Sequence, residues 1–152
     1  MVKKNIIIAI FVAVIVVLVG AFTCFFFNSS ESSEVSTSKP ITGEKWVWEK
    51  TVMNNDEVTT PNQAEAFTVT FDAEGQVTGT TDCNNFFGSY EIENNKITFG
   101  PLASTKMFCE DSQENVFHGF LGEVGSFFID ESNRLVLEIK FDSGSIIFKN
   151  GN

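Results

Sequence analysis

Two cysteines in the second half of the chain are the residues whose chemistry is easiest to anticipate. Cys83 and Cys109 could form a disulfide, could remain two buried thiols, or could bind a metal ion. A metal site is disfavoured because the single histidine, His118, does not complete a zinc ligand set with two lone cysteines. A disulfide is favoured: it would close a loop of about 26 residues, which the chain-entropy model values at roughly 3–4 kcal/mol. Buried thiols remain the alternative.

Catalytic arrangements are not evident elsewhere in the sequence. No Ser-His-Asp or Cys-His set can be assembled around His118, which falls within a helical pattern. The sequence has no P-loop, no GxGxxG and no EF-hand loop. Carboxylates pair at positions 56–57, 110–111 and 130–131, where turns and a solvated acidic surface explain them. We therefore expect a non-enzymatic protein with no catalytic, cofactor-binding or metal-binding residues.

The charge of the chain excludes one class of partner. All 20 acidic residues lie beyond residue 28, whereas Lys3 and Lys4 precede it. The part beyond residue 28 is therefore two charges more acidic than the whole chain, whose formal net charge is −10. A surface of this sign repels nucleic acid. We expect no DNA or RNA binding.

An uninterrupted apolar stretch near the start of the chain predicts a membrane anchor. Residues 6–27 would span roughly 33 Å as a helix, which is enough for the hydrocarbon core of a bilayer. Lys3 and Lys4 precede this stretch and acidic residues follow it, so residues 1–5 are expected in the cytoplasm. We predict a single-pass protein of the cell membrane whose C-terminal part is extracytoplasmic.

A retained anchor has two alternatives. A cleaved signal peptide usually has a shorter apolar region followed by small residues, and this stretch ends in Thr-Cys-Phe-Phe-Phe. Lipidation at Cys24 is the other alternative, although the residues before Cys24 form a poor lipobox. Residues 28–42 are rich in serine and acidic residues and predict a flexible linker, with the folded domain in residues 43–152.

Alternation of apolar and polar residues dominates the folded domain and predicts half-buried strands. Turns are expected at residues 73–75, at Asn94-Asn95 and at Ser143-Gly144. About seven or eight strands follow from this pattern. The apolar residues that define the expected strands lie at 46–48, 67–71, 76–80, 90–92, 97–99, 135–141 and 146–148.

One stretch, residues 111–124, has helical instead of strand periodicity. Asp111 and Glu114 resemble a capping box at its start. A single helix inserted late among strands predicts an antiparallel α+β domain in which the helix covers one face of the sheet or closes one end. The 17 phenylalanines predict a core packed mainly with aromatic rings.

The stretch from Asp82 to Cys109 carries a recognisable pattern, Cys-Asn-x-Phe-x-Gly-x-Tyr followed by Thr-x-Met-x-Cys. The pattern resembles the signature of the META domain, also called the HslJ-like domain. This resemblance implies a conical, partly open, barrel-like antiparallel sheet with one packed helix. It also implies structural roles for the matching residues, with Asn84 capping a turn, Gly88 supplying an unusual φ, and Phe86 and Tyr90 filling the core. The motif positions are Cys83, Asn84, Phe86, Gly88, Tyr90, Thr105, Met107 and Cys109.

The same resemblance shapes the expected function. Bacterial relatives are envelope proteins linked to heat shock and drug tolerance, and no established catalytic residues carry over. We expect a membrane-anchored binding domain that contacts a protein or another envelope component in the stress response or homeostasis of the cell envelope. The alternative is a carrier that holds a small apolar ligand in the barrel-like sheet. A hydrolase is a third and less favoured hypothesis.

Overall fold

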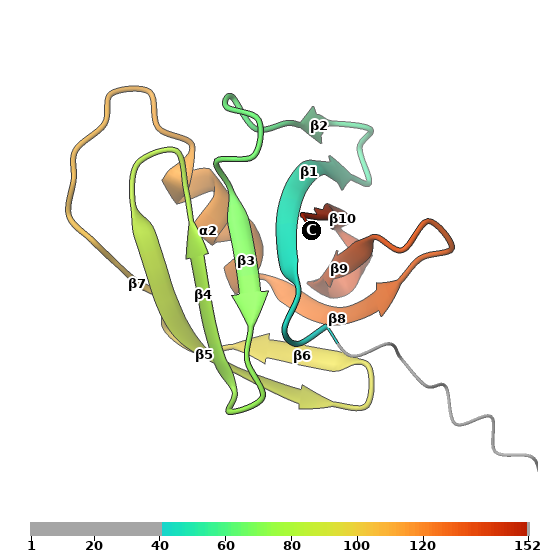
Figure 1. Ribbon diagram of the computed structural model, residues 1–152. Coiled ribbons are helices and arrows are strands. Elements are labelled where there is room, and N and C mark those ends of the chain that lie inside the picture. The colour runs from blue at the N-terminus through green and yellow to red at the C-terminus, as the bar shows by residue number, and fades with distance from the viewer. Residues whose placement is uncertain (1–40, 152) are drawn as a thin grey trace, which may run out of the picture. The chain divides into compact units, whose positions relative to one another are not determined.

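The alternating segments form antiparallel strands in the computed structural model, which describes residues 41–151 (Figure 1). Ten strands and one α-helix follow one another along this part of the chain. In order they are β1 (Lys45–Met53), β2 (Val58–Thr59), β3 (Thr68–Phe71), β4 (Gln76–Thr80), β5 (Asn85–Glu93), β6 (Lys96–Phe99), β7 (Ala103–Ser104), α2 (Glu114–Gly122), β8 (Val124–Ile129), β9 (Leu135–Ile139) and β10 (Gly144–Asn150), with a 3₁₀ turn η1 (Lys140–Asp142) between the last two.

The sheet closes on itself into a barrel. Its strand order is β10-β9-β8-β6-β5-β4-β3-β1, and β10 also pairs with β1, from Trp46↔Asn150 to Met53↔Gly144. The short strands β2 and β7 pair with β1 and β5 and lie outside this ring. The prediction of an antiparallel, barrel-like sheet is confirmed. The first long strand pairs along its length with the last, while β6 and β8 pair only at Lys96↔Ser126, where the ring is most open.

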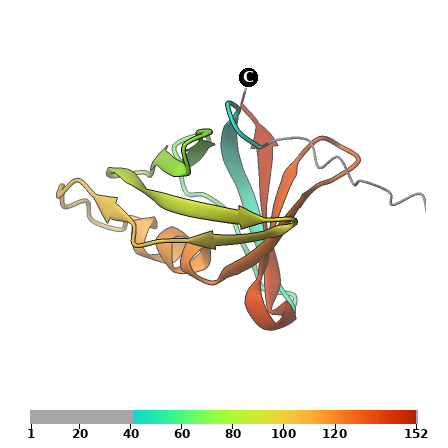
Figure 2. The same cartoon turned by 90° about the horizontal axis from the view of Figure 1, so that it is seen from below.

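The helix closes one end of the barrel, one of the two arrangements predicted for it (Figures 1 and 2). Phe117 and Leu121 of α2 are fully buried. The ring of Phe117 lies 5.1–6.2 Å from four aromatic rings of the barrel. These four rings belong to Trp48, Phe67, Phe86 and Phe148. A cluster of this kind combines apolar burial with favourable edge-to-face geometry, so α2 is an integral part of the core.

The indole nitrogens inside the barrel are paired. Trp46 Nε1 donates to Ile41 O at 2.9 Å, and Trp48 Nε1 donates to Thr51 Oγ1 at 3.1 Å. Ile41 is itself buried, and Thr42 bridges to Phe71, so both residues pack with the domain although the sequence placed them in the linker. The interior therefore consists of apolar side chains and satisfied indoles.

Two of the expected turns have the predicted backbone. Gly75 has φ +82° in the loop between β3 and β4, and Asn94 has φ 59° in the loop between β5 and β6. The third turn lies earlier than predicted. Because Ile139 pairs with Gly144, the chain reverses at residues 140–143, and Phe141 has φ 59° with 94% of its surface exposed. The prediction that Phe141 continues the buried face of the strand was wrong.

Within residues 41–151, no helix combines the length and apolar character needed to cross a membrane. The predicted anchor at residues 6–27, the preceding residues 1–5 and most of the predicted linker lie outside the described part.

Candidate binding site

The side chain of Asn84, just before β5, connects three segments of the chain. Its Oδ1 accepts hydrogen bonds from Thr105 Oγ1 at 2.7 Å and from Met107 N at 2.9 Å. Its Nδ2 donates to Met107 O at 3.1 Å and to Glu114 Oε2 at 2.7 Å. An amide side chain has two donor hydrogens and two acceptor positions, and all four are used here. Asn84 therefore joins the start of β5 to the loop between β7 and α2 (residues 105–113, the β7–α2 loop) and to the helix.

The backbone around Asn84 is held by a tight turn. Thr81 Oγ1 accepts from Cys83 N at 3.2 Å and from Asn84 N at 2.9 Å. Thr81 N in turn donates to Asn84 O at 2.8 Å. These bonds fix the conformation of residues 81–84, so the Asn84 amide is presented in one orientation.

Asp82 caps the helix from a distant point in the sequence. Its carboxylate accepts from Ser112 Oγ at 2.6 Å, from Gln113 N at 2.9 Å and from Asn62 Nδ2 at 2.9 Å. Burial by itself would raise the pKa of Asp82, but these hydrogen bonds outweigh it and hold the pKa below its usual value. A carboxylate at a helix N-terminus is also favoured by the helix dipole.

This remote cap replaces the predicted capping box. The helix begins at Glu114, its N-cap Gln113 makes no side-chain cap bond, and Asp111 has φ 61° and stands outside the helix. The prediction that Asp111 is the N-cap was wrong, because Ser112 Oγ accepts from Glu114 N at 3.1 Å and Asp82, in the turn before β5, accepts from Ser112 Oγ and Gln113 N.

The favoured disulfide between Cys83 and Cys109 is present, with the two Cα atoms 5.8 Å apart. Cys83 Sγ also lies 3.4 Å from Met107 O. The disulfide joins the β7–α2 loop to the barrel close to the point where Asn84 binds it. The loop is thus attached both covalently and by hydrogen bonds.

Four other motif positions have separate geometric roles. Phe86 and Tyr90 are buried in the core, and the Tyr90 hydroxyl donates to Asp72 O. Gly88 does not have a positive φ, so the prediction that it supplies an unusual φ was wrong. A Cβ on Gly88 would instead lie 2.7 Å from Leu102 Cδ2 and 2.9 Å from Pro101 O, so glycine permits the close approach of the next segment. Thr105 supplies the hydroxyl that binds Asn84.

Met107 differs from the other motif residues because its side chain is a large and exposed apolar group. Its backbone N–H and carbonyl bind Asn84, yet 63% of its surface is exposed. The next residue, Phe108, is 93% exposed. Two large apolar side chains therefore extend into solvent from a loop that is fixed in place.

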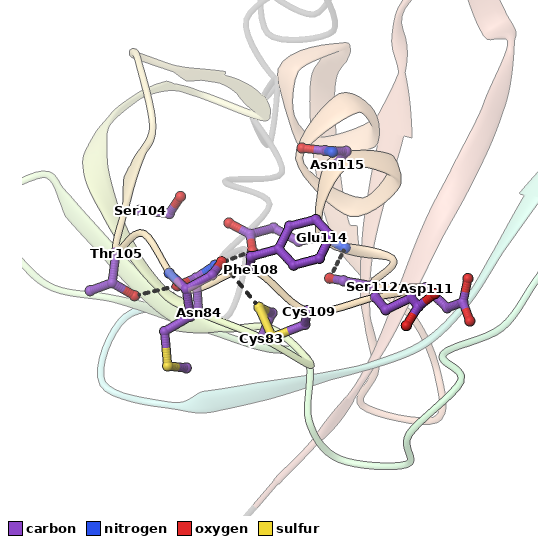
Figure 3. Close-up of a pocket in the computed structure, with 12 residues that line it drawn as sticks. Cys83, Asn84, Ser104, Thr105, Phe108, Cys109, Asp111, Ser112, Glu114 and Asn115 are labelled. Atoms are coloured by element: carbon purple, nitrogen blue, oxygen red, sulfur yellow. Dashed lines mark hydrogen bonds between the residues drawn. A yellow bond between two sulfur atoms is a disulfide. The ribbon is translucent and has the colours of Figure 1, made fainter.

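A hollow of about 410 Å³, named the loop pocket, opens beside these residues (Figure 3). Three carboxylate residues, Glu110, Asp111 and Glu114, contribute to its lining, and no Lys, Arg or His does so. Figure 3 shows the Phe108 ring near the middle of this group, with the disulfide and Asn84 on the barrel side and Asn115 on the helix. The lining residues are Cys83, Asn84, Ser104, Thr105, Met107, Phe108, Cys109, Glu110, Asp111, Ser112, Glu114 and Asn115.

Sequence reasoning identified the frame of this pocket and missed Phe108. One signal was available: Met107 and Phe108 are adjacent in a segment without helical or strand periodicity, so the two side chains are not expected to share one buried face.

His118 lies on the same helix but packs against apolar groups. Its ring is 4.9 Å from that of Phe86, and its Nε2 is buried without a hydrogen-bond partner in the described part of the chain. Burial lowers the pKa of His118, while the nearby carboxylate of Glu114 acts in the opposite direction. Among residues 41–151, no three His, Cys, Asp or Glu side chains are grouped so that they could hold a metal ion.

Comparison with known proteins identifies relatives of this domain. The family model described as META domain matches residues 39–149. An NMR structure of a protein from Burkholderia xenovorans superposes with a TM-score of 0.63 at 19% sequence identity, covering 74% of this chain and 84% of that one. A crystal structure of a DUF4847 family protein from Bacteroides vulgatus gives a TM-score of 0.54 at 17% identity, covering 71% of this chain and 92% of that one. At these identities the two structures show a common fold. No curated protein matches the sequence.

Proposed function

Because the chain belongs to the META domain family, we propose that it is a membrane-anchored, non-enzymatic binding domain that works outside the cytoplasmic membrane. Its binding surface is the β7–α2 loop with the loop pocket, and its partner is a protein or another component of the cell envelope. The anchor is the apolar stretch at residues 6–27. The role is in the stress response or homeostasis of the envelope.

One observation carries the proposal: Phe108 is almost fully exposed on a loop that Asn84 and the disulfide attach to the barrel. An almost fully exposed aromatic ring gains little from folding, because little of its apolar area is buried, but it is a favoured anchor at protein interfaces. A loop that is already fixed loses little conformational entropy when a partner binds it. Rigid attachment and exposure together suit a binding surface.

Three polar groups at or near the pocket support a non-enzymatic role, because the described contacts engage them in structure. Asp82 caps the helix, the Glu114 carboxylate accepts a bond from Asn84, and His118 packs against Phe86. A general acid or base would have to be available to a substrate.

A carrier function is less well supported. The interior positions of the barrel are filled by the protein's own rings, with Trp46, Trp48, Phe71 and Phe148 all at most 1% exposed. An apolar ligand inside the barrel would have to displace these side chains. We therefore favour the outer surface.

The binding surface is tested by photo-crosslinking in cells with the full-length chain. A photoreactive phenylalanine analogue at position 108 should give a discrete adduct with an envelope component. The same analogue at position 141 is a matched control, since Phe141 is 94% and Phe108 93% exposed. Adducts of equal yield at both positions, or none at 108, would overturn the proposed surface.

The anchor is tested separately by the intact mass of the detergent-extracted protein. A retained anchor gives the mass of the unprocessed chain. A chain that begins at Cys24 and carries acyl groups would make the protein a lipoprotein instead.

A further inference from the structure

Beside the pocket, β7 pairs only with β5, so its other edge is unpaired within residues 41–151, and residues 105–108 continue from this edge without strand structure. On the side facing the barrel, Thr105 N donates to Asn85 O at 3.0 Å and Met107 N donates to Asn84 Oδ1 at 2.9 Å. Lys106 lies between these two residues and Phe108 follows them. Neither Lys106 nor Phe108 makes a hydrogen bond within residues 41–151. The N–H groups of Thr105 and Met107 are thus engaged with the barrel, whereas the backbone groups of Lys106 and Phe108 are available to a partner. Such an edge is a template for another strand.

The side chains beside this edge favour a basic and apolar partner. Glu110, Asp111 and Glu114 in the pocket lining provide negative charge, and they outnumber Lys106, the one basic residue of segment 104–108. Met107 and Phe108 add apolar surface at the same place. Opposite charge favours association and selects among partners, and buried aromatic contacts supply much of the affinity.

These features define one occupant, and this inference rests on the proposed binding function. We propose that the surface binds an extended peptide segment of a partner protein, with alternating basic and apolar residues, by strand addition along residues 104–108. A lysine or arginine of that segment enters the loop pocket, and its apolar side chains contact Met107 and Phe108. Main-chain hydrogen bonds provide affinity in this mode, and the pocket provides specificity.

Other occupants fit the charges less well. A second copy of this chain carries the same formal net charge of −10, and anionic lipid headgroups share its sign. Both are included below as outcomes of the test.

The test measures binding of a fluorescent, end-capped peptide of alternating lysine and leucine to the full-length chain in a nonionic detergent. Binding should be saturable and should weaken with added salt. A peptide with glutamate in place of lysine controls for charge, and the lysine peptide with alternate amides N-methylated controls for strand pairing. Both control peptides should bind at least about tenfold more weakly.

Variants of the chain locate the peptide. Phe108→Ala should weaken binding more than about tenfold, as expected for an aromatic anchor. Glu110→Gln combined with Asp111→Asn should weaken it several-fold and reduce the salt dependence. Lys106→Pro removes a backbone donor that makes no bond in the free protein, so it should weaken binding several-fold, while Lys106→Ala keeps the donor and should not. A thermal melt of each variant verifies that it is folded.

Several outcomes would overturn the inference. The first is equal binding of the lysine and glutamate peptides, and the second is unchanged binding to the Lys106→Pro variant. The third is self-association of the chain, or binding of the chain to anionic vesicles, if Phe108→Ala abolishes it. If the crosslink at position 108 forms but the peptide does not bind, the strand-addition inference fails and the proposed function stands. If neither occurs, both fail.

Discussion

The barrel interior and the corner around Asn84 are both ordered, but different interactions hold them. The interior relies on aromatic rings, with Phe117 of the helix packed against rings from four other segments. The corner relies on a buried amide, the carboxylate of Asp82 and one disulfide. Non-directional packing tolerates rearrangement, whereas a hydrogen-bonded amide accepts only one geometry. The protein therefore uses apolar packing to form the domain and directional bonds to position one loop.

The largest effect should come from the interior. Phe117→Ala removes the ring that α2 inserts into the barrel end, and it should lower the free energy of unfolding by about 3–5 kcal/mol. Urea denaturation followed by tryptophan fluorescence measures this, because Trp48 lies 5.1 Å from the Phe117 ring. A loss below about 1 kcal/mol would show that the helix is not part of the core.

The next largest effect should come from the disulfide. Replacing both cysteines, Cys83→Ser with Cys109→Ser, should lower the free energy of unfolding by about 3–4 kcal/mol, because the unfolded chain regains the freedom of a 26-residue loop. Reduction of the wild-type protein should give the same loss in the same denaturation assay. If reduction leaves stability unchanged, hydrogen bonds alone hold the loop.

Substitution of Asn84 should have an intermediate effect that distinguishes the corner from the interior. Asn84→Ala leaves the Thr105 hydroxyl and the Met107 backbone without their partner and should cost about 1–3 kcal/mol. Asn84→Asp keeps the oxygen that accepts from Thr105 and Met107. It replaces Nδ2, which lies 2.7 Å from Glu114 Oε2, with a second carboxylate oxygen, so two carboxylates would meet there. Its stability should recover on acidification, when one carboxylate is protonated. Equal loss in the two variants, with no pH dependence, would contradict this account.

The smallest effect concerns His118. Its pKa is lowered by burial, so the unfolded chain binds a proton more readily than the folded protein. Stability should therefore fall as the pH drops through the unfolded value of about 6.5, and the loss should end below the folded pKa. His118→Gln should lack this fall when unfolding is measured between about pH 7 and pH 5. Asp82, whose pKa is also lowered, loses its contribution only at more acidic pH and does not obscure the result.

The two regions also differ in how far the sequence predicts them. Strand alternation, Gly75, Asn94 and the pair of cysteines are local or compositional signals, and each predicted its feature correctly. The contribution of Asp82 to the cap of α2 was not predictable, because Asp82 lies about 30 residues before the helix that it caps. The role of Gly88 depends on a contact with Leu102 that only the folded chain creates.

The loop pocket shows the same limit of local patterns. Thr105 and Met107 appear in the motif, but only the fold shows that their bonds to Asn84 leave the Met107 and Phe108 side chains outside. At Phe141 the alternation of apolar and polar residues continues in the sequence, but β9 has already ended at Ile139. The strand ends there because Ile139 pairs with Gly144 of β10, which places the turn at the residues between them.

The pairing of β1 with β10 has a consequence for how the protein is made. The two strands stand at opposite ends of the described chain, with Trp46 facing Asn150. Until residues 144–150 have left the ribosome, β1 lacks this partner strand, and the indoles of Trp46 and Trp48 lack part of their cover. Closure of the ring must therefore be a late event with high contact order, and β1 keeps an unpaired edge until β10 is available.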